Sequence, residues 1–163
     1  MPQTLNIDFL AIIKALQRGH VDFIVVGGVA AVLHGAPINT FDLDIVHARF
    51  PENIDRLIGA LGELGAHYRD QTGRKLPPAP LLLAGDGHNL FATTHGPLDV
   101  LGVIGTGHTY ETLLPDTIEQ SVGGFRLRVL ALGPLIRVKE ETARDKDRAV
   151  LAILRRTLEQ SSK

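Results

Sequence analysis

Three aspartates lie in two apolar segments that could bring their carboxylates together. Asp42 and Asp44 are separated by one leucine, and Asp99 is the lone acid in the apolar segment 98–104. Alternate residues of a strand point to the same face, so Asp42 and Asp44 would share a face while the leucine packs on the other. Carboxylates in an apolar strand repel one another and resist desolvation unless a cation lies between them. The pattern favours a site for a hard divalent cation, and a solvated acidic face on an edge strand is the alternative.

A glycine pair precedes these acids. Residues 23–26 are β-branched or aromatic and predict a strand that stops at Gly27-Gly28, where the chain can turn tightly and present backbone N–H groups to an anion. A short helix over 29–33 should follow and end at Gly35, ahead of the strand that carries the first two acids. A carboxylate pair of this kind can bind two divalent ions that hold the attacking and leaving oxygens of a phosphoryl group. The residues therefore favour metal-assisted phosphoryl or nucleotidyl transfer.

Composition and charge exclude several classes of protein. The 163 residues, 44% of them hydrophobic, predict one domain with a core of about 5–130 and a C-terminal helical segment of about 133–160. With no cysteine, the chain has no disulfide, no thiolate nucleophile and no cysteine-bound zinc. No apolar run is long enough to cross a membrane, and no signal-peptide pattern is visible. We therefore expect a cytoplasmic protein without a membrane partner.

The net charge of −1 hides an asymmetry along the chain. Residues 1–125 hold 7 Lys/Arg against 13 Asp/Glu, whereas residues 126–163 hold 10 against 5. An acidic part that could bind metal is thus followed by a cationic part that could bind phosphates, although a basic helix face can also be merely solvated. Seven scattered histidines form no zinc pair on a helix; His34 and His47 lie near the expected site, and each could be either a structural group or a ligand contact.

Hydrophobic periodicity predicts the remaining elements. The loop 71–80 contains Arg74 and Lys75 and could either close on a substrate or serve as a solvated connector. The expected helices are 5–18, with Thr4 or Asn6 as N-cap, 52–64, 108–114, and one from Gly133-Pro134 to about 159 with a break near Arg144. The expected strands are 67–70, 89–94, 98–104, 118–122 and 125–130, and Arg126 and Arg128 should share a face of the last. A glycine pair without a third glycine at dinucleotide spacing argues against a nicotinamide-binding fold.

At this point the sequence resembles the polymerase-β-like nucleotidyltransferase superfamily, specifically its minimal bacterial branch of toxin–antitoxin and abortive-infection nucleotidyltransferases. The segments that carry the resemblance are Val26-Gly27-Gly28, His34-Gly35, Thr40-Phe41-Asp42-Leu43-Asp44-Ile45, Leu98-Asp99-Val100-Leu101, Leu135-Ile136-Arg137-Val138-Lys139 and Arg144-Asp145-Lys146-Asp147. The resemblance covers most of the chain. It implies an α/β fold, a mixed β-sheet core flanked by helices, with the C-terminal helical segment beside it.

The resemblance also assigns roles to residues. Asp42 and Asp44 would bind two Mg²⁺ (or Mn²⁺) ions, and Asp99 would bind one of them and orient or deprotonate the acceptor hydroxyl. Gly27, Gly28 and Thr40 would position the triphosphate. Relatives often carry an arginine where this chain has Ile38. Phosphate would then be neutralised by other cations, for which the candidates are Arg126, Lys139, Arg144 and Lys146.

The expected activity is transfer of a nucleoside monophosphate from an NTP, such as ATP, to a hydroxyl on an RNA end, a protein side chain or a small molecule. Pyrophosphate would be released. Ile38 and the moderate charge motivate the alternative, a catalytically idle module of the same fold that acts by binding a cognate toxin or antitoxin.

Overall fold

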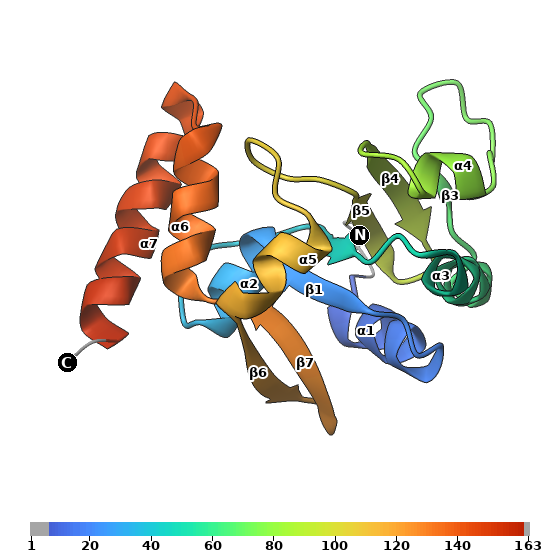
Figure 1. Ribbon diagram of the computed structural model, residues 1–163. Helices are drawn as coiled ribbons and strands as arrows, with labels where there is room; N and C mark the ends of the chain where they lie inside the picture. Colours follow the sequence, from blue (N-terminus) through green and yellow to red (C-terminus); the bar gives the residue numbers. More distant parts are fainter. Residues whose placement is uncertain (1–6, 162–163) are drawn as a thin grey trace, which may run out of the picture.

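Seven strands form one mixed sheet in residues 7–161, the part of the chain that the computed structural model describes (Figure 1). The strands are β1 (Phe23–Val26), β2 (Leu43–His47), β3 (His67–Tyr68), β4 (His88–Thr93), β5 (Gly96–Leu101), β6 (Thr117–Val122) and β7 (Phe125–Leu130). Their order is β3-β4-β5-β2-β1-β7-β6. The β1–β7 and β2–β5 pairs are parallel and the other pairs are antiparallel. This sheet, with its flanking helices, confirms the predicted mixed α/β fold.

The helices gather at both sides of the sheet. They are α1 (Phe9–Arg18), α2 (Gly27–Leu33), α3 (Pro51–Glu63), α4 (Pro80–Leu83), α5 (Tyr110–Leu113), α6 (Leu132–Glu141) and α7 (Arg148–Ser161), with short 3-10 turns η1 (Leu114–Asp116) and η2 (Asp145–Asp147). Figure 1 shows α6 and α7 packed together at one side, with α3 and α4 at the other. Within residues 7–161, no helix has the length and apolar character needed to cross a membrane.

Helices α1 and α4 differ from the sequence-based expectation. Helix α1 begins at Phe9, after Asp8, whose side chain accepts a hydrogen bond from the Ala11 N–H. The expected N-caps, Thr4 and Asn6, lie outside the described residues. Helix α4 was missing from the prediction, because its prolines read as loop signals. Pro80 is at the first helical position, where proline favours a helix start since its missing N–H would have no partner there.

A buried asparagine ties α3 to the sheet. Asn53 is fully buried, and its side chain accepts a hydrogen bond from the Asp22 N–H and donates to the carbonyls of Asp22 and Ala48. These three bonds join the start of α3 to the residues just before β1 and just after β2. These bonds therefore hold the start of β1 and the end of β2, which are the strand ends away from the glycine pair and the acids.

Replacing Asn53 by alanine should lower the free energy of unfolding by about 3 kcal/mol, because the Asp22 N–H and the Ala48 carbonyl would lose a side-chain partner and the Asp22 carbonyl would keep only the Ala48 N–H. Urea denaturation measures the difference. Arg56→Ala, at an exposed position of the same helix, is the control and should change stability by less than about 0.5 kcal/mol. Equal stability of the two variants would show that the bonds of Asn53 are dispensable.

Candidate functional site

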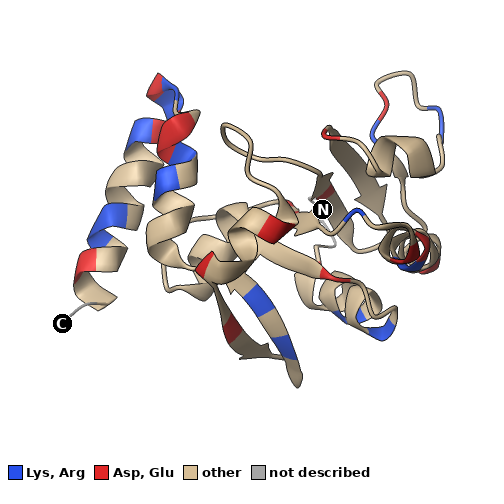
Figure 2. Ribbon diagram, in the orientation of Figure 1, with Lys and Arg blue, Asp and Glu red and all other residues tan. Residues whose placement is uncertain are grey.

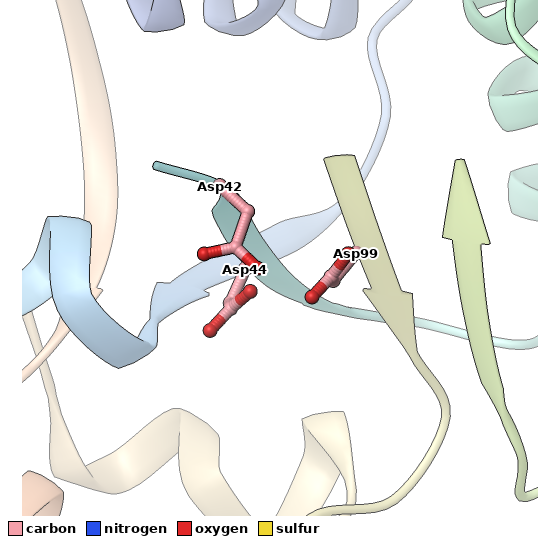
Figure 3. A group of neighbouring side chains, drawn as sticks. All are labelled: Asp42, Asp44 and Asp99. Atoms are coloured by element: carbon pink, nitrogen blue, oxygen red, sulfur yellow. The ribbon is translucent and has the colours of Figure 1, made fainter. Parts of the chain in front are cut away.

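The strand register places Asp44 and Asp99 side by side. Asp44 of β2 is opposite Asp99 of β5 on one side and opposite Val26, the last residue of β1, on the other. Directly paired residues project from the same face of a sheet, so both carboxylates leave the face next to the glycine turn. Asp42 lies one residue before β2 rather than within it. Figure 3 shows the three carboxylates converging, and each offers one oxygen within 4.8 Å of the others. The predicted convergence of the three acids is confirmed.

The three carboxylates repel one another, and burial disfavours the charged forms of Asp42 and Asp44. Burial, reinforced by the charges of Asp42 and Asp99, raises the pKa of Asp44 from 3.8 to about 8. Burial and the adjacent Asp99 carboxylate also raise the pKa of Asp42. Within the described residues, the buried Oδ1 of Asp44 has no hydrogen-bond partner. A buried oxygen without a donor, beside two further carboxylates, fits a hard divalent cation by its chemistry.

Arg69, just after β3, is a site residue that sequence reasoning did not find. Its Nη2 donates to Oδ1 of Asp99 at 2.7 Å, and its Nη1 donates to the carbonyl of Phe91 at 2.9 Å. The guanidinium therefore reaches across β4 and fixes the direction of the Asp99 side chain. Its positive charge also opposes the rise in pKa of both Asp42 and Asp44. No local motif marks this residue, because the contact depends on the pairing of β3 with β4.

The glycine pair lies against the acids and Thr40. Gly27 has a positive φ of 66°, and a Cβ at this position would strike Oδ2 of Asp44. A Cβ at Gly28 would lie only 2.6 Å from Oγ1 of Thr40, whose hydroxyl donates to the carbonyl of Asp42. Helix α2 begins at Gly27 itself, without the separate turn that the sequence suggested. Both glycines are thus required by close approach, and the start of α2 lies beside the carboxylates.

A cavity of about 400 Å³ opens beside this cluster. Gly27, Gly28 and Asp44 line one part of its wall. The remaining wall is largely apolar and comes from α2, the segment between α2 and β2, the end of β5 and the segment after it, and the helices α6 and α7. Its apolar residues are Ala31, Ile38, Leu101, Ile104, Leu135, Val138, Val150 and Leu154. Ile38 therefore contributes apolar surface where relatives often have arginine. The C-terminal helices α6 and α7 thus form one wall of the cavity.

Of the predicted phosphate-binding cations, one reaches the cavity. Lys139 of α6 lines it and pairs with Asp147 at 3.4 Å. Arg144 and Lys146 are exposed on the connection between α6 and α7 and are not among the lining residues. Arg126 is 80% exposed on β7, near the opposite sheet edge from β3, and pairs with Glu119 of β6.

The two histidines near the site are bound to backbone. The Nε2 of His34 lies 2.8 Å from the carbonyl oxygen of Leu130, which ties the end of α2 to β7. His47 is fully buried, and its Nε2 lies 2.6 Å from the carbonyl oxygen of Leu83. Burial lowers the pKa of His47, which keeps the ring neutral. Neither lines the cavity, so of the two readings that the sequence left open the structure supports the structural one for both.

The fold is shared with solved nucleotidyltransferase structures. The sequence matches no protein-family model and no curated protein sequence. In the structure of the lincosamide antibiotic adenylyltransferase LnuA with lincomycin, the match covers 92% of this chain and 98% of the other, with a TM-score of 0.62 and 10% identity. The match to ANT(2'')-Ia in complex with adenylyl-2''-tobramycin covers 92% of this chain and 87% of the other, with a TM-score of 0.58 and 13% identity. The match to the Thermotoga maritima protein TM1012, assigned as a nucleotidyltransferase, covers 93% of this chain and 91% of the other, with a TM-score of 0.57 and 14% identity. The chain therefore has the fold of the nucleotidyltransferases.

Proposed function

We propose that this protein transfers a nucleoside monophosphate from an NTP to a hydroxyl acceptor and releases pyrophosphate. The observation that carries the proposal is the convergence of Asp42, Asp44 and Asp99 beside the glycine pair, with one buried carboxylate oxygen left without a donor. Of the structures that share the fold, LnuA is named an adenylyltransferase, and ANT(2'')-Ia is in complex with adenylyl-2''-tobramycin, which supports ATP as a donor. We also propose that the protein acts in the cytoplasm and consists of a single domain.

Each acid has a role in this proposal. Asp42 and Asp44 would hold two divalent ions, Mg²⁺ or Mn²⁺, and Asp99 would hold one of them. Such ions, when bound, neutralise the charge that develops on the phosphoryl oxygens. Asp99 would also take the proton of the acceptor hydroxyl. Since its Oδ1 already accepts from Arg69, its other oxygen is the one available to that proton.

The cavity would hold the nucleotide. Its apolar walls between α2 and the helices α6 and α7 suit a nucleobase and sugar, since buried apolar area supplies affinity without a specific charge. Gly27 and Gly28 line the cavity and would position the triphosphate, and Thr40 lies against Gly28. Lys139 is the cation on the wall that could neutralise phosphate. Arg144 and Lys146 would contribute from the nearby α6–α7 connection only if their long side chains turn toward the cavity.

The proposal is tested by incubating the protein with each α-labelled NTP and Mg²⁺ or Mn²⁺, in the presence of RNA, of protein, or of the antibiotics tobramycin and lincomycin. Labelled product and pyrophosphate are expected. The Asp42→Asn, Asp44→Asn double variant should be slower by roughly 10³-fold, since bound metal supplies several kcal/mol of charge stabilisation. A folded wild-type protein that binds no NTP at any metal concentration would instead be a binding module, such as a toxin–antitoxin component.

A further inference from the structure

We infer that Glu141, the last residue of α6, is a positioning residue for the proposed transfer, because it holds a loop of the cavity wall against that helix. The inference rests on the proposed function and concerns the cavity in which the NTP would lie. The loop covers residues 102–109, between β5 and α5, and its Ile104 and Gly105 line the cavity. Figure 1 shows this loop reaching toward the end of α6.

The carboxylate of Glu141 accepts hydrogen bonds from two residues of the loop. Its Oε1 accepts from the backbone N–H and from the hydroxyl of Thr106, each at 3.1 Å. Nε2 of His108 lies 2.8 Å from Oε1 and 2.9 Å from Oε2, so the ring donates to the carboxylate. The bonds from His108 and from the Thr106 N–H lower the pKa of Glu141, which keeps the carboxylate ionised at neutral pH. Together these hydrogen bonds form the Glu141 latch.

The backbone of the loop is shaped for this close approach. A Cβ at Gly105 would strike Oε1 of Glu141 and would lie 3.2 Å from Cγ1 of Val138. Gly105 has a positive φ of 58°, which glycine adopts without steric cost. Ile104 and His108 exchange two backbone hydrogen bonds, of 3.0 and 2.9 Å, so the tip of the loop is a closed turn. The latch therefore attaches one preformed unit to α6.

The latch joins two parts of the proposed NTP site. Lys139, the candidate phosphate-binding lysine, lies two residues before Glu141, and Thr142 follows it; both line the cavity. The loop on the other side continues from β5, the strand that contains Asp99. An NTP in the cavity would contact the wall on both sides of the latch. Binding then costs less conformational entropy, because the wall is already held in place before the ligand arrives.

The neighbouring acid on α6 provides a matched control. The end of α6 is acidic (Figure 2), with Glu140 directly before Glu141. Glu140 pairs with Arg155 of α7 at 3.7 Å and makes no contact of this kind with the loop. Neither acid is among the residues that line the cavity. Removing either one changes the net charge equally, so a difference between the two variants in NTP binding reports the loop.

The binding test measures the affinity for a non-hydrolysable ATP analogue with Mn²⁺ by calorimetry, at a temperature where every variant is folded. In Glu141→Ala the dissociation constant should rise roughly tenfold, since hydrogen bonds to a charged group are lost and the ligand must then order the loop. Glu140→Ala should bind as the wild type does. Equal affinities of the two variants would overturn the inference.

A double-mutant cycle tests whether the effect passes through the loop. His108→Ala removes the partner of Glu141 and should also raise the dissociation constant of the analogue. The Glu141→Ala, His108→Ala variant should bind no more weakly than Glu141→Ala alone, because the second change has no bond left to break. Additive losses would mean that the two side chains act separately, and would overturn the inference.

Hydrogen–deuterium exchange without NTP separates this inference from the proposed function. Segment 102–109 should exchange faster in Glu141→Ala than in Glu140→Ala, while β5 exchanges equally in both, since only the loop loses its attachment. Faster exchange with unchanged affinity for the analogue would overturn the positioning role and leave nucleotidyl transfer intact. Failure of the wild type to bind the analogue would overturn both.

Discussion

Asp44→Asn is expected to slow nucleotidyl transfer by up to roughly 10³-fold and, at the same time, to stabilise the metal-free protein. Asp44 is held between two other carboxylates, and burial with their charge raises its pKa to about 8. An amide of nearly the same shape removes the repulsion and the cost of desolvating a charge. Gain of stability with loss of activity is the pattern expected for a functional residue and not for a structural ion pair.

The stabilisation should depend on pH. In the folded state Asp44 keeps its proton up to about pH 8, whereas in the unfolded chain it loses it near pH 3.8. The wild-type protein therefore has the full contribution of the protonated group below about pH 4 and loses it as the pH rises toward 8. The advantage of Asp44→Asn over wild type should be small at pH 4 and reach roughly 3 kcal/mol at pH 8.

Urea denaturation in the presence of EDTA at several pH values measures this difference. Asp55→Asn, at an exposed position of α3, is the matched control and should follow the wild type throughout. If the advantage of Asp44→Asn were independent of pH, the carboxyl would already be ionised in the folded protein. An Asp44→Asn protein with wild-type transfer would remove Asp44 from the site.

Gly27→Ala should have the second-largest effect, because the added methyl group would occupy the position of the Asp44 carboxylate. The backbone at Gly27 has φ 66°, so alanine pays about 1–2 kcal/mol for the left-handed conformation alone. Oδ2 of Asp44 must also move away, and Asp44 is held by the pairing of β2 with both β1 and β5. We expect transfer to fall by roughly 100-fold or more, since a displacement of about 1 Å can cost this much.

Gly35→Ala separates the two causes. Gly35 also has a positive φ, of 93°, but nothing lies within 4 Å of a Cβ built there. This variant should lose a similar amount of stability from backbone strain while retaining transfer. Steady-state rates of transfer and melting temperatures of the two variants provide the comparison. Equal activity of the two variants would show that the space beside Asp44 is not needed for the reaction.

The sequence predicted what depends on local pattern. The spacing of Asp42 and Asp44 and the apolar run before Gly27 are local, and both were placed correctly. The position of Asp99 depends on the parallel pairing of β2 with β5, which lies far apart in sequence. No periodicity encodes such a pairing, so its approach to Asp44 was inferred from its place as a lone acid in an apolar segment and from the family resemblance.

Contacts between side chains on different strands could not be predicted from the sequence. Arg69 follows a strand of only two residues, His67–Tyr68, and reaches Asp99 only because β4 lies between β3 and β5. Arg144 and Lys146 were proposed from the family resemblance and from their charge, but neither specifies which way the connection between the helices faces. Helical periodicity predicted the C-terminal helical segment, yet it could not show that Leu135 and Val150 of this segment line a cavity.

The central claim, that the three carboxylates bind metal for an NTP in the cavity, is tested most directly by counting Mn²⁺ ions by electron paramagnetic resonance with a non-hydrolysable NTP analogue. The account predicts two bound Mn²⁺ ions per wild-type chain. In the Asp42→Asn, Asp44→Asn variant, Mn²⁺ should not change the affinity for the analogue. Asp55→Asn should bind as the wild type does. Binding of the analogue with equal affinity with and without Mn²⁺, or equally by the double variant, would contradict the claim.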